Sequence, residues 1–201
     1  MRVAAVVLAA GASTRLGRPK QLVLHEGEPL VRRAVRAAVD AGARPVVVVL
    51  GARAAEIAPA LDGVAGIDVI THARWADGLG ASLAAGLRAL DAGSGSAGSG
   101  DAPTDGVLLT VCDQPLVDAR ALGALIDAFA GPATAVAAEY AGTLGVPAVI
   151  GRDHLDAFRT RTGDAGAGRW LRAHAALVTP VPMPAAAFDV DTEADVVRLG
   201  G

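Results

Sequence analysis

The sequence predicts an α/β fold, a three-layer α/β/α sandwich built around a mostly parallel sheet. The main observation is that short apolar runs alternate along the chain with segments of helical periodicity. The runs are apolar throughout, which is typical of parallel strands buried on both faces. A chain of 201 residues suits one domain, and because 52% are hydrophobic but only 3% aromatic, we expect a core of small aliphatic side chains.

The first half of the chain shows the alternation most clearly. Apolar runs at residues 3–8 and 45–50 predict two parallel strands, and apolar positions between Leu30 and Val39 recur with helical spacing. This helix should end near Gly42, giving a right-handed strand–helix–strand unit. The same reasoning predicts a helix over 54–61, a strand over 67–71 and a helix over 82–90.

The second half is less regular, and we expect some antiparallel strand there. Strands are predicted over 107–112, 134–138, 147–150 and 188–190, and helical segments over 117–129, 154–158, 168–175 and 192–199. Residues 92–104 are rich in glycine and serine and cannot bury enough apolar area to order themselves. We therefore predict a single domain, 1–201, with a flexible surface loop at about 92–104.

Charge and composition exclude several classes of function. The net charge of −3 argues against broad binding to nucleic acid, which needs a dense basic surface. A lone cysteine, Cys112, cannot form an intrachain disulfide, which suits the cytoplasm. No apolar stretch is long enough to span a membrane as a helix. The apolar run after Arg2 vaguely resembles a signal peptide, but a buried first strand explains it better.

The loop after the first strand is the most informative segment. Small residues at 9–13 let backbone N–H groups approach a ligand closely, and Arg15, Arg18 and Lys20 supply positive charge. The loop follows a strand end, where open α/β sheets bind ligands, so it could hold a triphosphate. It matches neither the P-loop nor the dinucleotide-binding motif G-x-G-x-x-G. The alternative is an ordinary glycine-rich turn with solvated charges.

Two carboxylates are candidate ligands for Mg²⁺, which prefers oxygen donors and usually takes one or two carboxylates together with phosphates and water. Asp113 directly follows the strand over 107–112, at the same predicted sheet edge as the first loop. Asp191 lies near the C-terminus, and Asp189 is left outside the predicted site. The alternatives are a turn or cap role for Asp113 and an N-cap role for Asp191.

Other polar residues are weaker candidates. The four histidines are widely scattered, so a zinc site is not indicated. Cys112 is interpreted as a small core residue rather than a nucleophile. Ser82, near a predicted helix start, could cap that helix or lie beside a nucleobase.

Several motifs resemble those of one family. The segment Leu8-Ala-Ala-Gly-x-Ser-x-Arg-x-Gly-x-x-Lys20 closely resembles the signature loop of the MobA-like NTP transferases, most of all the molybdenum cofactor cytidylyltransferase branch. Trp75-x-x-Gly78, Cys112-Asp-Gln-Pro115, Gly145-x-Pro147, Gly163-Asp-x-Gly-Ala167 and Asp189-x-Asp191 resemble later motifs in the same order. The chain departs from the family at four positions, His72, Ala81, Val146 and Gly168, and the last two weaken the assignment of the acceptor.

The resemblance implies a Rossmann-like nucleotidyltransferase fold with a mostly parallel mixed sheet, and transfer of CMP from CTP to the phosphate of molybdopterin with release of pyrophosphate. It implies nucleotide contacts from Leu8, Ala9, Ala10, Gly11 and Ser82, catalytic roles for Arg15 and Lys20, and Mg²⁺ on Asp113 and Asp191. The alternatives are GTP or a sugar phosphate as substrate, a protein that binds and delivers cofactor to a client molybdoenzyme, and a nucleotide-dependent oxidoreductase on a related fold.

Overall fold

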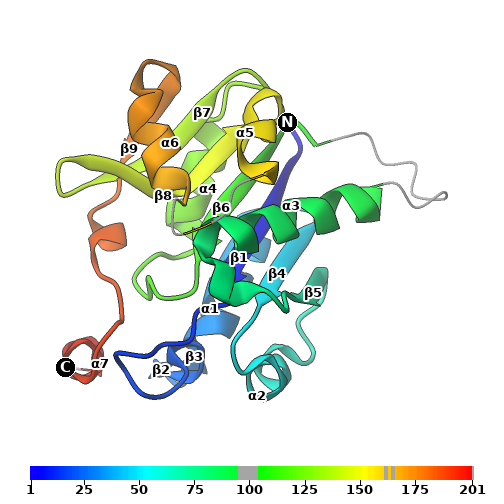
Figure 1. Cartoon of the computed structure of the whole chain (residues 1–201). Coiled ribbons are helices and arrows are strands. Elements are labelled where there is room, and N and C mark those ends of the chain that lie inside the picture. The colour runs from blue at the N-terminus through cyan, green and yellow to red at the C-terminus, as the bar shows by residue number, and fades with distance from the viewer. Residues whose placement is uncertain (95–103, 161–162, 164–165, 201) are drawn as a thin grey trace.

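The computed structural model describes residues 1–94, 104–160, 163 and 166–200, and its centre is a seven-stranded sheet (Figure 1). The strands are β1 (Val3–Ala9), β4 (Val46–Leu50), β5 (Ile67–Thr71), β6 (Gly106–Val111), β7 (Ala135–Tyr140), β8 (Thr143–Gly151) and β9 (Val178–Pro182). Their spatial order is β5-β4-β1-β6-β8-β7-β9. β8 pairs antiparallel with both β6 and β7, and the other pairings are parallel, so the predicted mostly parallel mixed sheet is confirmed.

Helices cover both faces of this sheet, which confirms the three-layer prediction. The helices are α1 (Leu30–Asp40), α2 (Ala54–Ile57), α3 (Leu79–Ser94), α4 (Ala119–Ala128), α5 (Asp156–Arg159), α6 (Ala167–Ala173) and α7 (Glu193–Gly200). One apolar cluster joins α1 and α4 to the sheet through residues such as Val35 and Leu122. A second cluster joins α3, α5 and α6 to the opposite face through Leu87, Phe158 and Trp170.

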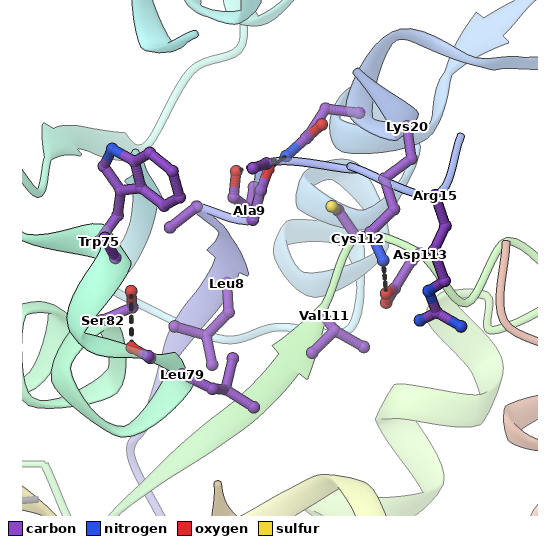
Figure 2. A pocket seen from close by; sticks show the side chains of 16 residues that line it. Leu8, Ala9, Arg15, Lys20, Trp75, Leu79, Ser82, Val111, Cys112 and Asp113 are labelled. Atoms are coloured by element: carbon purple, nitrogen blue, oxygen red, sulfur yellow. Dashed lines mark hydrogen bonds and ion pairs between the residues drawn. The ribbon is translucent and has the colours of Figure 1, made fainter. Parts of the chain in front are cut away.

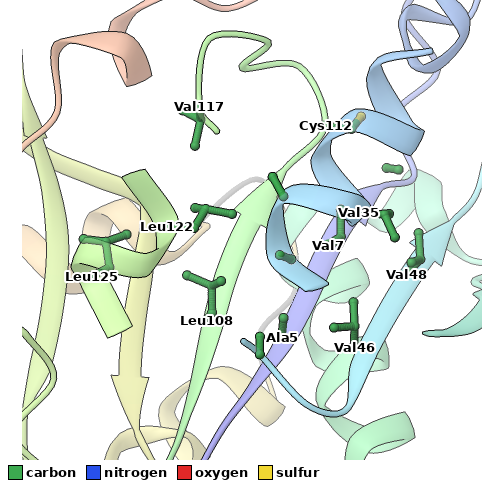
Figure 3. Packing of buried hydrophobic residues seen from close by; sticks show 14 of the residues in the cluster. Ala5, Val7, Val35, Val46, Val48, Leu108, Cys112, Val117, Leu122 and Leu125 are labelled. Atoms are coloured by element: carbon green, nitrogen blue, oxygen red, sulfur yellow. The ribbon is translucent and has the colours of Figure 1, made fainter. Parts of the chain in front are cut away.

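β1 shows why the two clusters form. Successive side chains of a strand point to opposite faces, and those of β1 divide between the two clusters in strict alternation. Ala5 and Val7 pack under α1 and α4 (Figure 3), whereas Ala4 and Val6 pack under α3. All of β1 is buried, so the strand lies at the centre of the molecule and delivers the first loop to the carboxyl edge of the sheet.

Gly86 sets the position of α3 relative to the sheet. A Cβ atom at this position would lie 2.6 Å from Val6 Cγ1 and 2.9 Å from Val49 Cγ2, closer than packed atoms approach. Only glycine therefore allows α3 to lie this close to β1 and β4. This close packing fixes the first turn of α3, which contains Leu79 and Ser82, at the carboxyl ends of the central strands.

Three features of the fold differ from the sequence prediction. The predicted strand at 188–190 is wrong, because this segment makes one backbone hydrogen bond, from Val190 N to Asp113 O at 2.9 Å, instead of a strand ladder. β9 was not predicted. α3 begins at Leu79 and continues through Ser94, so residues 92–94 of the predicted loop are helical, while 95–103 lie outside the described residues.

A short hairpin of β2 (Leu24–His25) and β3 (Glu28–Pro29) follows the first loop. A third apolar cluster packs Val196 and Leu199 of α7 against Leu16, Val23 and Val190. The C-terminal segment therefore lies beside the first loop, although the two are far apart in sequence. Within the described residues, no helix has the length and apolar character that crossing a membrane requires.

Candidate active site

A cavity of about 500 Å³ opens at the carboxyl ends of β1 and β6, which are neighbours in the sheet (Figure 2). Residues 8–11 and Ser82, the two predicted catalytic cations Arg15 and Lys20, and Asp113 all line it. Figure 2 shows Trp75 and Ser82 at one end of the cavity, and Lys20, Arg15 and Asp113 at the other. The two ends differ in chemistry, one being aromatic and weakly polar and the other strongly charged.

The first loop is held in place by Gln21, a buried side chain that the sequence analysis did not single out. Its Nε2 atom donates 2.9 Å hydrogen bonds to the carbonyl oxygens of both Ala9 and Gly11. Ser13, with a left-handed φ of 55°, accepts a hydrogen bond from the backbone N–H of Lys20 at 3.0 Å. These bonds tie the two ends of the loop together and fix its conformation from within the chain. The only feature of the sequence that points to a role for Gln21 is its position directly after Lys20.

Lys20 lies between the two predicted metal ligands. Its Nζ atom is 2.5 Å from Asp113 Oδ2 and 3.0 Å from Asp191 Oδ1, and its side chain is only 16% exposed. Burial by itself lowers the pKa of Lys20, but the negative charge of Asp113 acts in the opposite direction and prevails, so the pKa is raised above its usual value. The amine therefore stays protonated throughout the physiological pH range. Lys20 is also the only lysine of the chain, beside 17 arginines.

Asp191 reaches this cluster from the C-terminal segment without lining the cavity itself. Its second oxygen, Oδ2, accepts a 2.7 Å hydrogen bond from Arg15 Nη2. The alternative role of Asp191 as an N-cap is wrong, because Thr192 and Asp195 form the cap of α7. Asp195 N donates to Thr192 Oγ1 at 3.3 Å, and Thr192 N donates to Asp195 Oδ2 at 2.9 Å.

Asp113 does not cap a helix either. α4 is capped by Asp118, whose Oδ1 accepts a hydrogen bond from Ala121 N at 2.8 Å. The remaining oxygen of Asp113, Oδ1, is buried and has no hydrogen-bond partner. A buried, unpaired carboxylate oxygen is costly unless a cation or donor binds it, so Asp113 and Asp191 fit the requirements of a divalent cation.

Ser82 lies in the first turn of α3 and is 2% exposed. Its hydroxyl lies 3.4 Å from the carbonyl oxygen of Gly78, one turn earlier, and its backbone N–H also donates to that oxygen. Ser82 is therefore not an N-cap, and it lines the cavity. Gly78, with φ at 102°, packs directly against Gly163, and Gly163 N donates to Asp77 O at 2.7 Å.

Cys112 is confirmed as a buried residue of the core. Burial, reinforced by the charge of Asp113, raises the pKa of its thiol to about 12. A thiol with this pKa is protonated at neutral pH and is a poor nucleophile. Asp189 has a raised pKa of about 6, through partial burial and the charges of Asp113 and Asp191.

A model of the MobA-like NTP transferase domain matches residues 5–178. "Nicotine blue oxidoreductase" of Paenarthrobacter nicotinovorans is 32% identical to this chain. The match covers 98% of this chain and 96% of the relative. The bifunctional protein GlmU of Anaeromyxobacter dehalogenans strain 2CP-C is 38% identical over 128 residues, and the chain covers a quarter of its length.

Solved structures share the fold over the whole chain. The crystal structure of Rv0371c from Mycobacterium tuberculosis H37Rv aligns with a TM-score of 0.77 and 28% identity, over 99% of this chain and 98% of that one. A second structure of the mycobacterial protein is a complex with manganese and aligns with a TM-score of 0.76, at 27% identity. Both cover nearly the whole chain, including the C-terminal segment that lies beyond the family match.

Proposed function

From the premise that the chain belongs to the MobA-like NTP transferase family, we propose that it transfers CMP from CTP to the phosphate of molybdopterin and releases pyrophosphate. One observation carries the proposal: three distant stretches of the chain come together, since the first loop and Asp113 line one cavity and Asp191 contacts Arg15 and Lys20 of that loop. The cavity has charge at one end for phosphates and weakly polar walls at the other for a base and sugar.

The bonds that form and break in this reaction belong to the substrates rather than to the protein. An anionic phosphate oxygen of the acceptor forms a bond with the α-phosphorus of CTP, and the bond from that phosphorus to the β-phosphate oxygen breaks. No general base is needed, because the attacking oxygen carries no proton. The chain contributes by positioning both reactants and by stabilising negative charge.

Each cation has a role in this scheme. The backbone N–H groups of residues 9–13 and the Arg15 guanidinium bind the β- and γ-phosphates. Lys20 neutralises charge between the α-phosphate and the attacking phosphate, and its raised pKa keeps it charged for this task. Ser82 and the backbone of residues 8–10 contact the base.

Asp113 and Asp191 would hold Mg²⁺, and the unpaired Oδ1 of Asp113 is the oxygen available for it. When bound, the ion would add positive charge beside the phosphates. A related mycobacterial protein has been crystallised with manganese, which supports a divalent cation in this proposal. Lys20 contacts the other oxygen of Asp113 and one oxygen of Asp191, so the ammonium would lie beside the ion.

The proposal is tested by incubating the whole chain with Mg²⁺ and each of CTP, GTP, ATP and UTP, with molybdopterin or a hexose 1-phosphate as acceptor. Pyrophosphate release is measured and the product is weighed by mass spectrometry. We expect release only with CTP and molybdopterin, and a product heavier by one CMP unit. Release with GTP, or with the sugar phosphate alone, would assign the site to one of the alternative substrates.

The name of the Paenarthrobacter relative raises a redox function as a second candidate. We favour nucleotidyl transfer, because the sequence lacks the dinucleotide motif G-x-G-x-x-G and the cavity instead combines Arg15 and Lys20 with a candidate metal ligand. Oxidation of NADH or NADPH in the presence of a dye acceptor, without pyrophosphate release from any nucleotide, would favour the redox function.

A cytoplasmic location and a client molybdoenzyme remain part of the proposal. A reducing compartment suits the lone, buried Cys112, and molybdopterin would be passed on after modification. If the chain binds molybdopterin tightly but releases no pyrophosphate with any nucleotide, delivery rather than catalysis is its function.

A further inference from the structure

A second, smaller cavity of about 160 Å³ adjoins the first one. The two share Leu8, Leu79 and Val111, which form a common apolar wall. Leu79 lines both cavities and is 41% exposed, so its side chain is accessible to a molecule bound in the main cavity. A molecule reacting in the main cavity can therefore extend over Leu79 into the smaller one.

The walls of this side cavity are mostly aliphatic or bare backbone. Leucine, valine and alanine side chains line it together with Gly145, Gly166 and Gly168. Among the described residues that line it, polar side chains come only from Tyr140, Thr143 and Arg172. The hydroxyl of Tyr140 already donates to Val146 O at 3.1 Å, so it has no hydrogen left for a ligand.

Arg172 differs from the cations of the main cavity in its pairing. Arg15 and Lys20 each contact a carboxylate, whereas in the described part of the chain no carboxylate pairs with Arg172. Its one hydrogen bond to a described residue is long, 3.5 Å from Nη1 to Leu144 O. A guanidinium with unused donors beside an apolar cavity is suited to bind an oxygen of a ligand.

Gly168 makes room for this guanidinium. A Cβ atom at Gly168 would lie 3.1 Å from Arg172 Nη1, so the end of the arginine occupies space that a side chain at 168 would otherwise fill. The next residue, Arg169, is exposed on α6 and does not line the cavity. The charge at this cavity therefore comes from Arg172, one helical turn after the glycine.

We propose that the side cavity binds a planar heterocyclic part of the acceptor, and that Arg172 is a specificity residue that binds an oxygen on the edge of that ring. The proposal deepens the function proposed above and rests on it for the identity of the main cavity. A cavity of roughly 150 Å³ holds one six-membered ring, so one ring of a fused heterocycle fits the side cavity while the rest extends over Leu79 toward the main cavity. A sugar is a poorer fit, because few groups here could satisfy its hydroxyls.

The test uses pterin-6-carboxylate as a fluorescent probe, titrated with the whole chain and with the variants Arg172→Ala, Arg172→Lys and Arg169→Ala. Loss of a charge-assisted hydrogen bond should weaken binding to Arg172→Ala by about 10- to 100-fold. Arg172→Lys should be intermediate, and Arg169→Ala should bind within about two-fold of the wild type, since Arg169 lies off the cavity. Melting temperatures verify that all variants are folded.

Equal affinities of the wild type and Arg172→Ala would overturn the proposal, as would an absence of probe binding to the wild type. Displacement of the probe by glucose 1-phosphate at lower concentrations than by unlabelled pterin would also overturn it. Pyrophosphate release is measured separately. Arg172-dependent probe binding without any release from CTP and molybdopterin would reject the proposed function and retain this inference.

Discussion

Lys20 is the residue on which the charge balance of the site depends. Its ammonium contacts two carboxylates, so one positive charge is shared between the two candidate metal ligands, and Arg15 adds a second on Asp191. Sequence reasoning placed cations and carboxylates at the same sheet edge, but not in contact with one another. This pairing depends on the C-terminal segment, which brings Asp191 to the first loop from 171 residues away.

Replacing Lys20 with alanine should lower turnover by about 10²- to 10³-fold, the scale of other groups that stabilise charge in a transition state. The measurement is single-turnover CMP transfer at saturating CTP, which separates chemistry from nucleotide affinity. Arg53→Ala is the matched control, since Arg53 pairs with Glu56 away from the cavity. A near-normal rate for Lys20→Ala would remove Lys20 from the mechanism.

Cys112 offers a prediction on pH, because its pKa is raised from 9.0 to about 12 in the folded chain. Between these values the unfolded state loses the thiol proton and the folded state keeps it, so stability falls as the pH rises above about 9. Below pH 9 the thiol has no effect, because both states are protonated.

The corresponding measurement is the urea midpoint of the wild type and Cys112→Ala between pH 7 and pH 11. The wild type should lose more stability than the variant over the upper part of this range. Iodoacetamide at pH 8 should also leave the native thiol unmodified and react with it in urea. Rapid alkylation of the native chain would show that the thiol is not buried as described.

At the level of elements, the strands that carry the site follow from sequence better than those at the sheet edge. β1, β4 and β6 are continuous apolar runs, as fully buried parallel strands must be, and the predicted bounds differ by about one residue. β9 contains Pro180 and Pro182, which argue against a strand, yet its edge position tolerates both.

The rest of the site is held by hydrogen bonds between side chains and the backbone. These hydrogen bonds could not be predicted from the sequence. Gln21 holds the first loop through carbonyls 10 and 12 residues away, and Thr192 takes the capping role that the sequence left open to Asp191. Both depend on tertiary geometry rather than on periodicity. The segment 188–190 alternates apolar and polar residues as a strand does, but Val190 packs against Leu16 and Val23 instead.

Substitutions at two glycines, one in α3 and one in α4 as a control, test how closely α3 packs on the sheet. Gly86→Ala should destabilise the chain by about 1–3 kcal/mol, since the added methyl group overlaps Val6 and Val49 and pushes α3 off the sheet. Gly123→Ala is the control: Gly123 lies in α4, and a methyl group added there would have no atom within 4 Å, so the change should stabilise by about 0.5–1 kcal/mol.

Urea denaturation measures both glycine variants. Displacement of α3 also moves Leu79 and Ser82, so nucleotide affinity should fall in Gly86→Ala and remain unchanged in Gly123→Ala. Equal stabilities for the two variants would contradict the close helix–sheet contact described at Gly86.

Across the whole molecule, the sheet carries the functional residues at one edge, and the strand order explains why. β1 and β6 are parallel neighbours, so the loops that follow them meet, and the apolar clusters on both faces hold these strands in place. The C-terminal segment then packs α7 beside the first loop and contributes Asp191. Sequence predicted the layers and the meeting of the loops, whereas this final packing required the structure.

The central claim is that the cavity binds a metal–triphosphate beside Lys20. Because Lys20 is the only lysine, a chain labelled with ¹³C,¹⁵N-lysine gives one side-chain NMR signal, which can be followed during titration with Mg²⁺ and CTP. We predict a large, saturable shift as the ammonium exchanges carboxylate for phosphate, reproduced by pyrophosphate and absent with cytidine. A Lys20 signal that stays unchanged when the chain is saturated with Mg²⁺ and CTP would contradict the account.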